Sequence, residues 1–406
     1  MAIYISKPGV MCGAGCSLEE LQKSVIAGNQ NGIKKVKACN DKEYFASKIQ
    51  DKFLKKSSAR YDMRIMRIEE AALNQIEDDI KTAINQFGSQ RIAVCVGSCD
   101  NGTEFSVAGH RKYFENKTFA ADYNLEIQGA DYVSTFIAEK YGIKGAVNTF
   151  STACSSSASA TIKAAEMIMA GLADAVIAGG IDIASDTVLL GFDSLEAVSP
   201  EITNPFSKNR KGITLGEAGV FYILSKEPLK SSKNDKNVIL LGWGESADAY
   251  HNTSPDPTGN GAKKAMEKAL KSAKITKNDI DYINLHGTGT KFNDSMEAKA
   301  VNAVFGDLKV PVSTTKPITG HTLGAAASLE LAVCFSVINN AELPVQVWDK
   351  QYDCEFPKLN FVNENYSCVQ NKKKTKICLS NSFAFGGANA CLVIASSDII
   401  SYDMIN

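Results

Sequence analysis

Residues 148–171 read NTFSTACSSSASATIKAAEMIMAG and place one cysteine, Cys154, among serine, threonine and alanine. From residue 162 onward, apolar residues recur at helical spacing, which predicts a helix that begins at or near the cysteine. A thiol at a helix start faces the positive end of the helix dipole, so we expect the Cys154 pKa to be lowered. A small core cysteine beside a tight turn explains this stretch equally well.

The composition is that of an ordinary globular protein. The chain has 406 residues, of which 44% are hydrophobic and 22% charged, with a net charge of -1. This length allows two core-forming units. The near-zero charge argues against bulk binding to nucleic acid or to a membrane surface. Because Glu166, Asp174 and Asp182 interrupt the richest apolar run, we predict no membrane span, which needs roughly 18 apolar residues.

The cysteines indicate neither a disulfide framework nor a metal site. They number eleven and lack paired short spacings. Cys12 and Cys16, or Cys95 and Cys99, have no second Cys/His pair nearby, so we predict buried or loop thiols and no metal. The apolar start at residues 3–5 is cut by a lysine and a proline, unlike a signal peptide. These features predict a reducing, cytoplasmic location.

Strands and helices alternate along the chain, which indicates a layered α/β fold. Residues 91–97 are predicted as a buried strand and residues 64–87 as one long amphipathic helix. Residues 34–60 and 104–130 are predicted as surface excursions.

The second part of the chain repeats the order of the first. The strand at 281–285 opens into a histidine loop, as the strand at 91–97 opens into a polar loop. Residues 319–340 repeat the pattern of the Cys154 stretch, a small-residue turn followed by an alanine-rich helix. We therefore expect Cys154 and His321 to be counterparts at the starts of two packed helices.

This repeat predicts two similar halves joined by a polar linker at residues 231–237. Residues 1–230 would form the half that carries the cysteine, and residues 238–406 the half that carries the histidines.

Two of the four histidines lie in small-residue loops beside buried elements. His286 follows a predicted strand and precedes GTGT, and His321 lies between Gly320 and Thr322. Taken singly, each is more often an interior histidine than a catalytic residue.

The motifs become specific as an ordered set. TACSSS contains Cys154, HGTGT begins at His286, TKPITGHTLGAA contains Lys316 and His321, and NSFAFGGAN ends the series at residues 381–389. NPFSKNRKGITLGEAG at residues 204–219 adds a supporting match. Together these motifs resemble the signature of the β-ketoacyl-acyl-carrier-protein synthases over nearly the whole chain.

The resemblance implies a thiolase-like fold of five α/β/α/β/α layers, built from two similar halves and assembled as a dimer. It is to the elongating branch, which uses Cys-His-His rather than Cys-His-Asn. A thiolase would carry a second cysteine where this chain has Phe385, Gly386 and Gly387. Cys391, further on, is predicted as a strand residue.

The implied reaction is a decarboxylative Claisen condensation. Cys154 would take an acyl group from one carrier protein, forming a thioester. His286 and His321 would hydrogen-bond the malonyl thioester oxygen and stabilise the enolate formed as carbon dioxide leaves. The backbone N–H groups of Cys154 and Phe385 would hold the tetrahedral oxyanion, with Gly386 and Gly387 permitting close approach.

The resemblance also implies supporting roles. Lys316, paired with Glu330, would hold the histidine loop and tune its charge. Asp294 and Glu297 would buttress the His286 loop. The pantetheine arm of the carrier would be bound by three threonines and by a turn made of the gating aromatic residue and two glycines. These residues are Thr253, Thr288, Thr290, Phe385, Gly386 and Gly387.

The segment SCDNG at residues 98–102 departs from the family pattern. The matching loop of saturated fatty-acid synthases is glycine-rich and apolar, whereas this chain has Asp100 and Asn101. With the short N-terminus and residues 248–259, this loop is more similar to synthases of aryl-polyene or related pathways.

No cofactor is implied, because the substrates travel on the phosphopantetheine of an acyl carrier protein. That carrier is acidic, so we expect a basic docking surface near the site. The partner in the dimer would be a second copy or a chain-length-factor-like subunit. Two groups of basic residues are candidates for docking: Lys52, Lys55, Lys56, Arg60 and Arg64, or Lys208, Arg210 and Lys211.

Two rival functions fit parts of the pattern. A non-catalytic partner subunit would lack the cysteine, yet this chain keeps Cys154, His286 and His321 together. A cysteine hydrolase would need an acid that orients its histidine and a site open to water.

Overall fold

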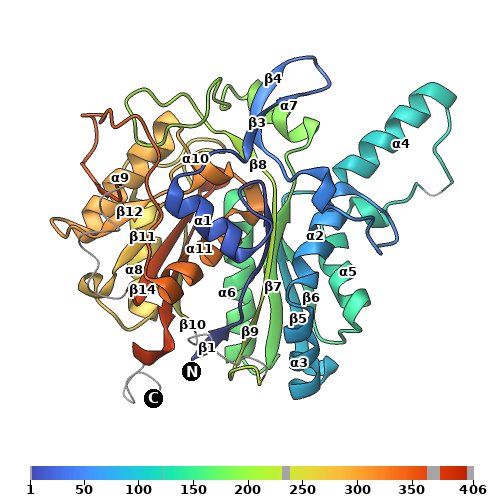
Figure 1. The fold of residues 1–406 in the computed structure, drawn as a ribbon, viewed down its shortest axis with the longest axis horizontal. Helices are drawn as coiled ribbons and strands as arrows, with labels where there is room; N and C mark the ends of the chain where they lie inside the picture. Colours follow the sequence, from blue (N-terminus) through green and yellow to red (C-terminus); the bar gives the residue numbers. More distant parts are fainter. Residues whose placement is uncertain (1, 122, 231–237, 364–374, 400–406) are drawn as a thin grey trace.

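The computed structural model describes residues 2–121, 123–230, 238–363 and 375–399. Twelve strands of this part form one hydrogen-bonded sheet that has two arms joined by the N-terminal strand (Figure 1). The linker predicted at residues 231–237 lies outside the described residues.

The first arm has the spatial order β6-β5-β7-β9, and β1 and β2 both pair with β9. β5, β6 and β7 are parallel to one another, and β9 is antiparallel to β7. The strands are β1 (Ile3–Ile5), β2 (Gly9–Cys12), β5 (Ile92–Gly97), β6 (Val147–Phe150), β7 (Ala175–Asp182) and β9 (Ala218–Ser225).

The second arm has the order β12-β11-β14-β15-β10, with β13 beyond β12. If the strands of each arm are numbered as they occur along the chain, both arms have the same spatial order, which is third, second, fourth, fifth, first. The joining strand β1 and the outermost strand β13 are left out of this numbering, so β2 and β10 are the first strands. In both arms the fifth strand is antiparallel to its neighbours on either side. The strands are β10 (Val238–Ala247), β11 (Tyr282–Asn284), β12 (Pro311–Ser313), β13 (Asn360–Phe361), β14 (Ile377–Phe383) and β15 (Ala388–Ser396).

Helices complete five layers, and the predicted thiolase-like fold is confirmed. Two helices fill the space between the arms, three cover the outer face of the first arm, and two cover the outer face of the second (Figure 1). In that order they are α6 (Ser156–Met169) and α11 (Ala326–Asn340); α2 (Arg64–Asn74), α3 (Glu77–Phe87) and α5 (Tyr132–Tyr141); and α8 (Asn260–Ser272) and α9 (Lys291–Phe305).

The alternation of side chains along each strand accounts for these layers. In β5, Ala93 and Cys95 face the central helices, while Ile92, Val94 and Val96 face the outer ones. Because both faces of this strand are covered, β5 is buried and apolar along its whole length.

β15 alternates in the same way, with Leu392 facing the central helices and Cys391 facing the outer ones. Cys391 is thus a strand residue, as predicted.

Three predicted segments differ in the structure. Residues 34–60 contain a hairpin, β3 (Ile33–Lys37) and β4 (Glu43–Ser47), which pairs with β8 (Leu215–Gly216). Residues 104–130 contain the helix α4 (Thr103–Asn116), which projects from the body (Figure 1).

The predicted helix at 64–87 is two helices, because the chain breaks at Gln75 and Ile76. The Gln75 side-chain amide donates to the Val10 carbonyl over 2.9 Å and accepts from the Val10 N–H over 3.1 Å. These two hydrogen bonds connect the junction between α2 and α3 to β2.

One apolar segment in the described part of the chain is long enough to cross a membrane by length and composition, although no apolar run of that length was expected from the sequence. It is Leu323–Asn340, which includes α11, and 89% of it is buried inside the protein. Its apolarity is explained by its place between the two arms, where every face of a helix is covered. The remaining helices are α1 (Leu18–Ala27), α7 (Asp186–Ser194) and α10 (Lys316–Thr319).

Candidate active site

Cys154 lies in a 3-10 turn, η4 (Ala153–Ser155), directly before α6. Its side chain is buried. Ala153 has a φ of 52°, a left-handed conformation that is strained for a residue with a side chain. This turn places the Cys154 thiol at the N-terminal end of α6, between the two arms of the sheet.

The start of α11 repeats this turn in the other half. Leu323, with a φ of 54°, begins η6 (Leu323–Ala325), as Ala153 begins η4. The helices are therefore counterparts, but Cys154 corresponds to Gly324. His321 lies three residues earlier, so the prediction that Cys154 and His321 are counterparts is wrong in register.

His321 contacts the cysteine directly. Its Nε2 lies 3.0 Å from the Cys154 sulfur, and its Nδ1 accepts the backbone N–H of Leu323 over 3.3 Å. Because Nδ1 accepts, the ring proton is on Nε2, and the histidine donates toward the sulfur. Burial, together with the charge of Lys316, lowers the pKa of His321 well below its ordinary value, so the ring is neutral.

His286 follows β11 and completes a cluster of three groups. The rings of His286 and His321 are 5.4 Å apart and nearly perpendicular, at 87°. Donor atoms of both rings and the Cys154 sulfur all lie within 4.8 Å of one another. Burial is the main cause that lowers the His286 pKa well below its ordinary value, with Lys316 and His321 adding to it. Both histidines are thus neutral, and each ring carries a single N–H.

Such a spacing would also allow a metal ion, but the hydrogen bonding opposes one. Since Nδ1 of His321 is engaged with Leu323, its Nε2 carries a proton and has no lone pair for a metal.

The loop that carries His286 is fixed by two buried carboxylates on α9. Glu297 accepts the backbone N–H groups of His286 and Gly287, each over 2.8 Å. Asp294 accepts the N–H groups of Thr288 and Gly289, each over 3.1 Å. This arrangement orients the loop and leaves the histidine ring to face the cysteine.

Burial raises the Cys154 pKa to about 11, and this outweighs three opposing effects. The backbone N–H of Phe385, the charge of Lys316 and the N–H of Cys154 itself all lower it. The expected lowering of the Cys154 pKa is therefore wrong, because desolvation exceeds these three effects. Cys154 is a thiol at neutral pH.

Lys316 and Glu330 form a buried ion pair beside this cluster. Lys316 begins α10, and Glu330 lies on α11. Burial raises the Glu330 pKa to about 7, although Lys316 opposes this rise. The lysine also lowers the pKa of both histidines, so it holds them in the neutral form.

Comparison with known proteins identifies this arrangement. The family model for the β-ketoacyl synthase N-terminal domain matches residues 15–228, and that for the C-terminal domain matches residues 238–347. The chain belongs to the β-ketoacyl synthase family.

Relatives and solved structures agree. The synthase is 31% identical to the 3-oxoacyl-[acyl-carrier-protein] synthase 2 of Coxiella burnetii, over 97% of this chain and 98% of that protein. It is 35% identical, with a TM-score of 0.85, to the ketosynthase ApeO in complex with its chain length factor ApeC from Xenorhabdus doucetiae, and the match covers 98% of both chains. The ishigamide ketosynthase/chain length factor shares the fold, with a TM-score of 0.86 at 23% identity over 97% of this chain and 99% of that chain.

In the synthase, the glycine turn lies against Cys154. Phe385 begins η7 (Phe385–Gly387), and its N–H acts on the Cys154 sulfur. Gly386 and Gly387 both have positive φ, at 82° and 77°. The Asp248 N–H donates to the Gly387 carbonyl over 2.9 Å, so this turn is bound to the segment that follows β10.

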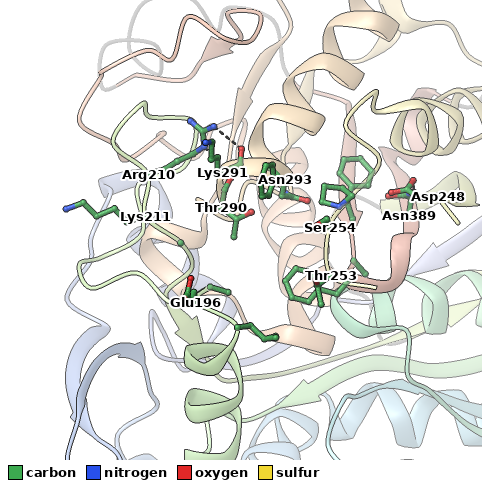
Figure 2. Close-up of a pocket in the computed structure, with 18 residues that line it drawn as sticks. Glu196, Arg210, Lys211, Asp248, Thr253, Ser254, Thr290, Lys291, Asn293 and Asn389 are labelled. Carbon is green, nitrogen blue, oxygen red and sulfur yellow. Dashed lines mark hydrogen bonds between the residues drawn. The ribbon is translucent and has the colours of Figure 1, made fainter. Parts of the chain in front are cut away.

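A cavity of about 340 Å³ lies beside this turn (Figure 2). Thr253, Thr290 and Phe385 line it, as does Phe383, whose ring lies 6.2 Å from that of His286. Thr288 is buried behind the wall and shares a hydrogen bond with Thr290, at 3.2 Å between the hydroxyls. The structure thus brings Thr253 and Thr290 to the cavity, while Gly386 and Gly387 lie outside its lining.

Two arginines proposed for carrier docking form ion pairs with carboxylates inside the protein instead. Arg64 is bound to the buried carboxylate of Glu217, at 2.5 Å. Arg210 is almost fully buried, pairs with Asp353 at 2.5 Å and lies over the ring of Phe356. The sequence showed their charge but not these partners.

Asp182, at the end of β7, is a site residue that the sequence analysis missed. Its buried carboxylate accepts the N–H groups of Cys99 and Gly324, the latter over 2.6 Å. It therefore joins the polar loop at 98–102 to the turn before α11. Burial raises the Asp182 pKa to about 7. An acidic residue at the end of a wholly apolar strand was the signal in the sequence.

Asp100 in that loop is also buried. It accepts the Gly102 N–H over 2.7 Å and the hydroxyl of Tyr132 over 2.8 Å. The polar side chain is thus paired within the protein.

Proposed function

We propose that this chain is a β-ketoacyl-acyl-carrier-protein synthase that condenses an acyl group on Cys154 with malonyl-carrier by decarboxylation. The observation that supports this most is the cluster of Cys154, His286 and His321, in which both rings are neutral donors beside a buried thiol. A hydrolase would need a histidine that accepts the thiol proton, but Nε2 of His321 already carries one.

In the first half-reaction, Cys154 attacks the acyl thioester of a loaded carrier. The sulfur–carbon bond to the carrier breaks, and the thiol proton leaves with the carrier thiolate, because His321 cannot accept it. The tetrahedral oxyanion is held by the N–H groups of Cys154 and Phe385, both of which already act on the sulfur.

In the second half-reaction, the malonyl thioester oxygen takes the position between the histidines. Their N–H groups stabilise the enolate as the carbon–carboxyl bond breaks and carbon dioxide leaves. The carbanion then attacks the acyl carbon on Cys154, the bond from that carbon to the sulfur breaks, and the departing Cys154 thiolate takes up a proton from solvent to restore the thiol. Lys316, held by Glu330, keeps both imidazoles neutral so that each retains a proton to share.

The substrates arrive on phosphopantetheine, and no further cofactor or metal is proposed. Thr253, Thr290 and Phe385 line the cavity and would guide the arm through it, whereas Thr288, Gly386 and Gly387 lie outside the lining and would support these residues. Asp294 would support the His286 loop. A cytoplasmic location suits substrates carried in this way. Residues 1–230 and 238–406 are proposed as the two halves.

The similarity to ApeO, which occurs in complex with a chain length factor, supports an assignment to the aryl-polyene type. The polar loop with Asp100 and Asn101 supports it too. The chain would then act in a dimer with a chain-length-factor-like subunit rather than with a second copy. Co-purification from the native host would show which dimer forms.

The test of the proposed function is condensation by the purified synthase, with its partner if one co-purifies. Acyl-carrier and malonyl-carrier should give β-ketoacyl-carrier and carbon dioxide, and Cys154→Ala should abolish the product. A Cys154→Ala protein that still condenses these substrates would refute the proposal. Cys39→Ala, an exposed cysteine, is the matched control and should leave the rate unchanged.

A further inference from the structure

The first turn of α9 forms one wall of the cavity beside Phe385. Thr290, which precedes the helix, and Lys291, Phe292 and Asn293 all line the cavity. Arg210 fixes this turn, since its guanidinium donates to the carbonyl of Lys291 over 2.8 Å and to that of Thr290 over 3.3 Å (Figure 2). The wall is therefore preformed.

Asn293 differs from the other polar groups of this wall because its amide is buried without a full set of partners. The residue is 8% exposed, and its Nδ2 has almost no accessible surface and makes no hydrogen bond within the residues that the structure describes. Buried polar groups in folded proteins are nearly always paired. Because Nδ2 is itself buried, a ligand in the cavity can pair with it once the Asn293 side-chain amide turns toward the cavity.

Another amide of the lining is already engaged. Asn389 donates to the carboxylate of Asp248 over 2.7 Å and to the Gly387 carbonyl over 3.2 Å. Thr253 and Thr290 offer only hydroxyls. Asn293 alone among these four lining side chains offers an uncommitted amide, which carries a donor and an acceptor in one plane.

We propose that Asn293 is a positioning residue that pairs through its side-chain amide with an amide of the pantetheine arm. The arm contains secondary amides, each with a carbonyl and an N–H, and rotation about the Asn293 side chain can present the complementary group to either. This inference rests on the proposed function, since a carrier-bound substrate brings such an arm.

The test compares two acyl donors with the same acyl group, the acyl-carrier and a simple alkyl thioester that contains no amide. Asn293→Ala should slow acylation of Cys154 from the carrier about 10-fold, the effect of one lost hydrogen bond. Acylation from the alkyl thioester should be unchanged. Asn302→Ala, an exposed asparagine on the same helix, is the matched control and should leave both rates unchanged.

The unfolding midpoint provides a readout that separates positioning from a structural role. Asn293→Ala should be at least as stable as the parent, because it removes an unpaired buried amide. A lower midpoint, an unchanged carrier rate, or equal losses with both donors would each overturn the inference. Asn293→Ser should show the same split between the two donors as Asn293→Ala, and no split would overturn the inference.

Failure of the proposed function would look different. In that case the parent protein itself would not be acylated at Cys154 by any acyl-carrier.

Discussion

At the scale of single residues, the backbone N–H of Leu323 decides what His321 can do. By donating to Nδ1, it places the ring proton on Nε2, 3.0 Å from the Cys154 sulfur. Lys316 and burial keep the ring neutral. The histidine is thereby fixed as a donor to sulfur or to a substrate oxygen, rather than as a base.

This assignment predicts different losses in the two half-reactions. His286→Ala and His321→Ala should each slow carbon dioxide release from malonyl-carrier by about 10²–10³-fold, the effect of removing one oxyanion donor. Acyl transfer to Cys154 should be affected less. The two steps can be measured separately by trapping carbon dioxide and by following the mass of the protein. Equal loss of both steps would count against the assigned roles.

The buried pair of Lys316 and Glu330 predicts a stability effect. Lys316→Ala leaves the Glu330 carboxyl without its partner and should lower the free energy of unfolding by about 3–5 kcal/mol. The double variant Lys316→Met with Glu330→Leu should recover most of this loss, because it removes both polar groups. Denaturant unfolding measures both. A single variant as stable as the parent would show that the pair contributes nothing.

At the scale of elements, the glycine turn and the segment after β10 act as one unit. A Cβ on Gly387 would meet the Asp248 Cβ at 2.8 Å, whereas a Cβ on Gly386 would meet nothing within 4 Å. Both glycines have positive φ, so both substitutions carry the same type of backbone strain.

These two glycines give a matched pair of variants. Gly386→Ala should cost about 1–2 kcal/mol of stability from strain alone. Gly387→Ala should cost more and should also lower the rate, since it pushes the turn away from Asp248 and moves the Phe385 N–H away from the sulfur. Unfolding midpoints and condensation rates measure this difference. Equal effects of the two substitutions would show that the contact with Asp248 is unimportant.

The sequence predicted elements where the local pattern was complete. The sequence predicted the apolar strands and the helix after Cys154, because elements that are covered on both faces are apolar or small-residue segments that can be recognised locally. The same elements recur in the second half, so the repeated order could be predicted too. The break at Gln75 was not visible, because its cause is a contact with Val10 from another part of the chain. The offset between Cys154 and His321 depends on backbone angles in two turns, which small-residue sequences do not specify.

At the scale of the whole molecule, the site is surrounded by buried carboxyl groups. Burial raises the pKa of Glu297 and Glu330 to about 7 from an ordinary value of 4.5, and that of Asp182 to about 7 and Asp294 to about 6 from 3.8. The folded protein therefore binds protons between about pH 4.5 and 7 that the unfolded chain releases. The two histidines oppose this below pH 6.5, since their folded pKa values are lowered.

Because four carboxyl groups outnumber two histidines, stability should fall as pH rises through this window. The unfolding midpoint should be higher at pH 6 than at pH 8, and each retained proton contributes about 1.4 kcal/mol per pH unit. Added salt should change this difference little, because buried groups are poorly screened. A midpoint that rises from pH 6 to pH 8 would contradict the pKa shifts.

Tertiary burial also limits what the sequence could show about the site. Cys154, His286, His321 and Lys316 were identified by their motifs, and the structure gathers them. The pKa of Cys154 could not be predicted from its helix start, because desolvation between the arms exceeds the effect of the helix. Asp182 was missed for the same reason, since its partners come from two distant loops.

The central claim is that Cys154 carries the acyl group. Intact-mass and peptide mass spectrometry of the purified synthase, incubated with a panel of acyl-carriers, tests it most directly. We predict that one acyl group is added per chain, on the peptide that contains Cys154, and that Cys154→Ala gains none. Absence of a stable acyl-enzyme with every acyl-carrier, or an acyl group on another residue, would contradict it.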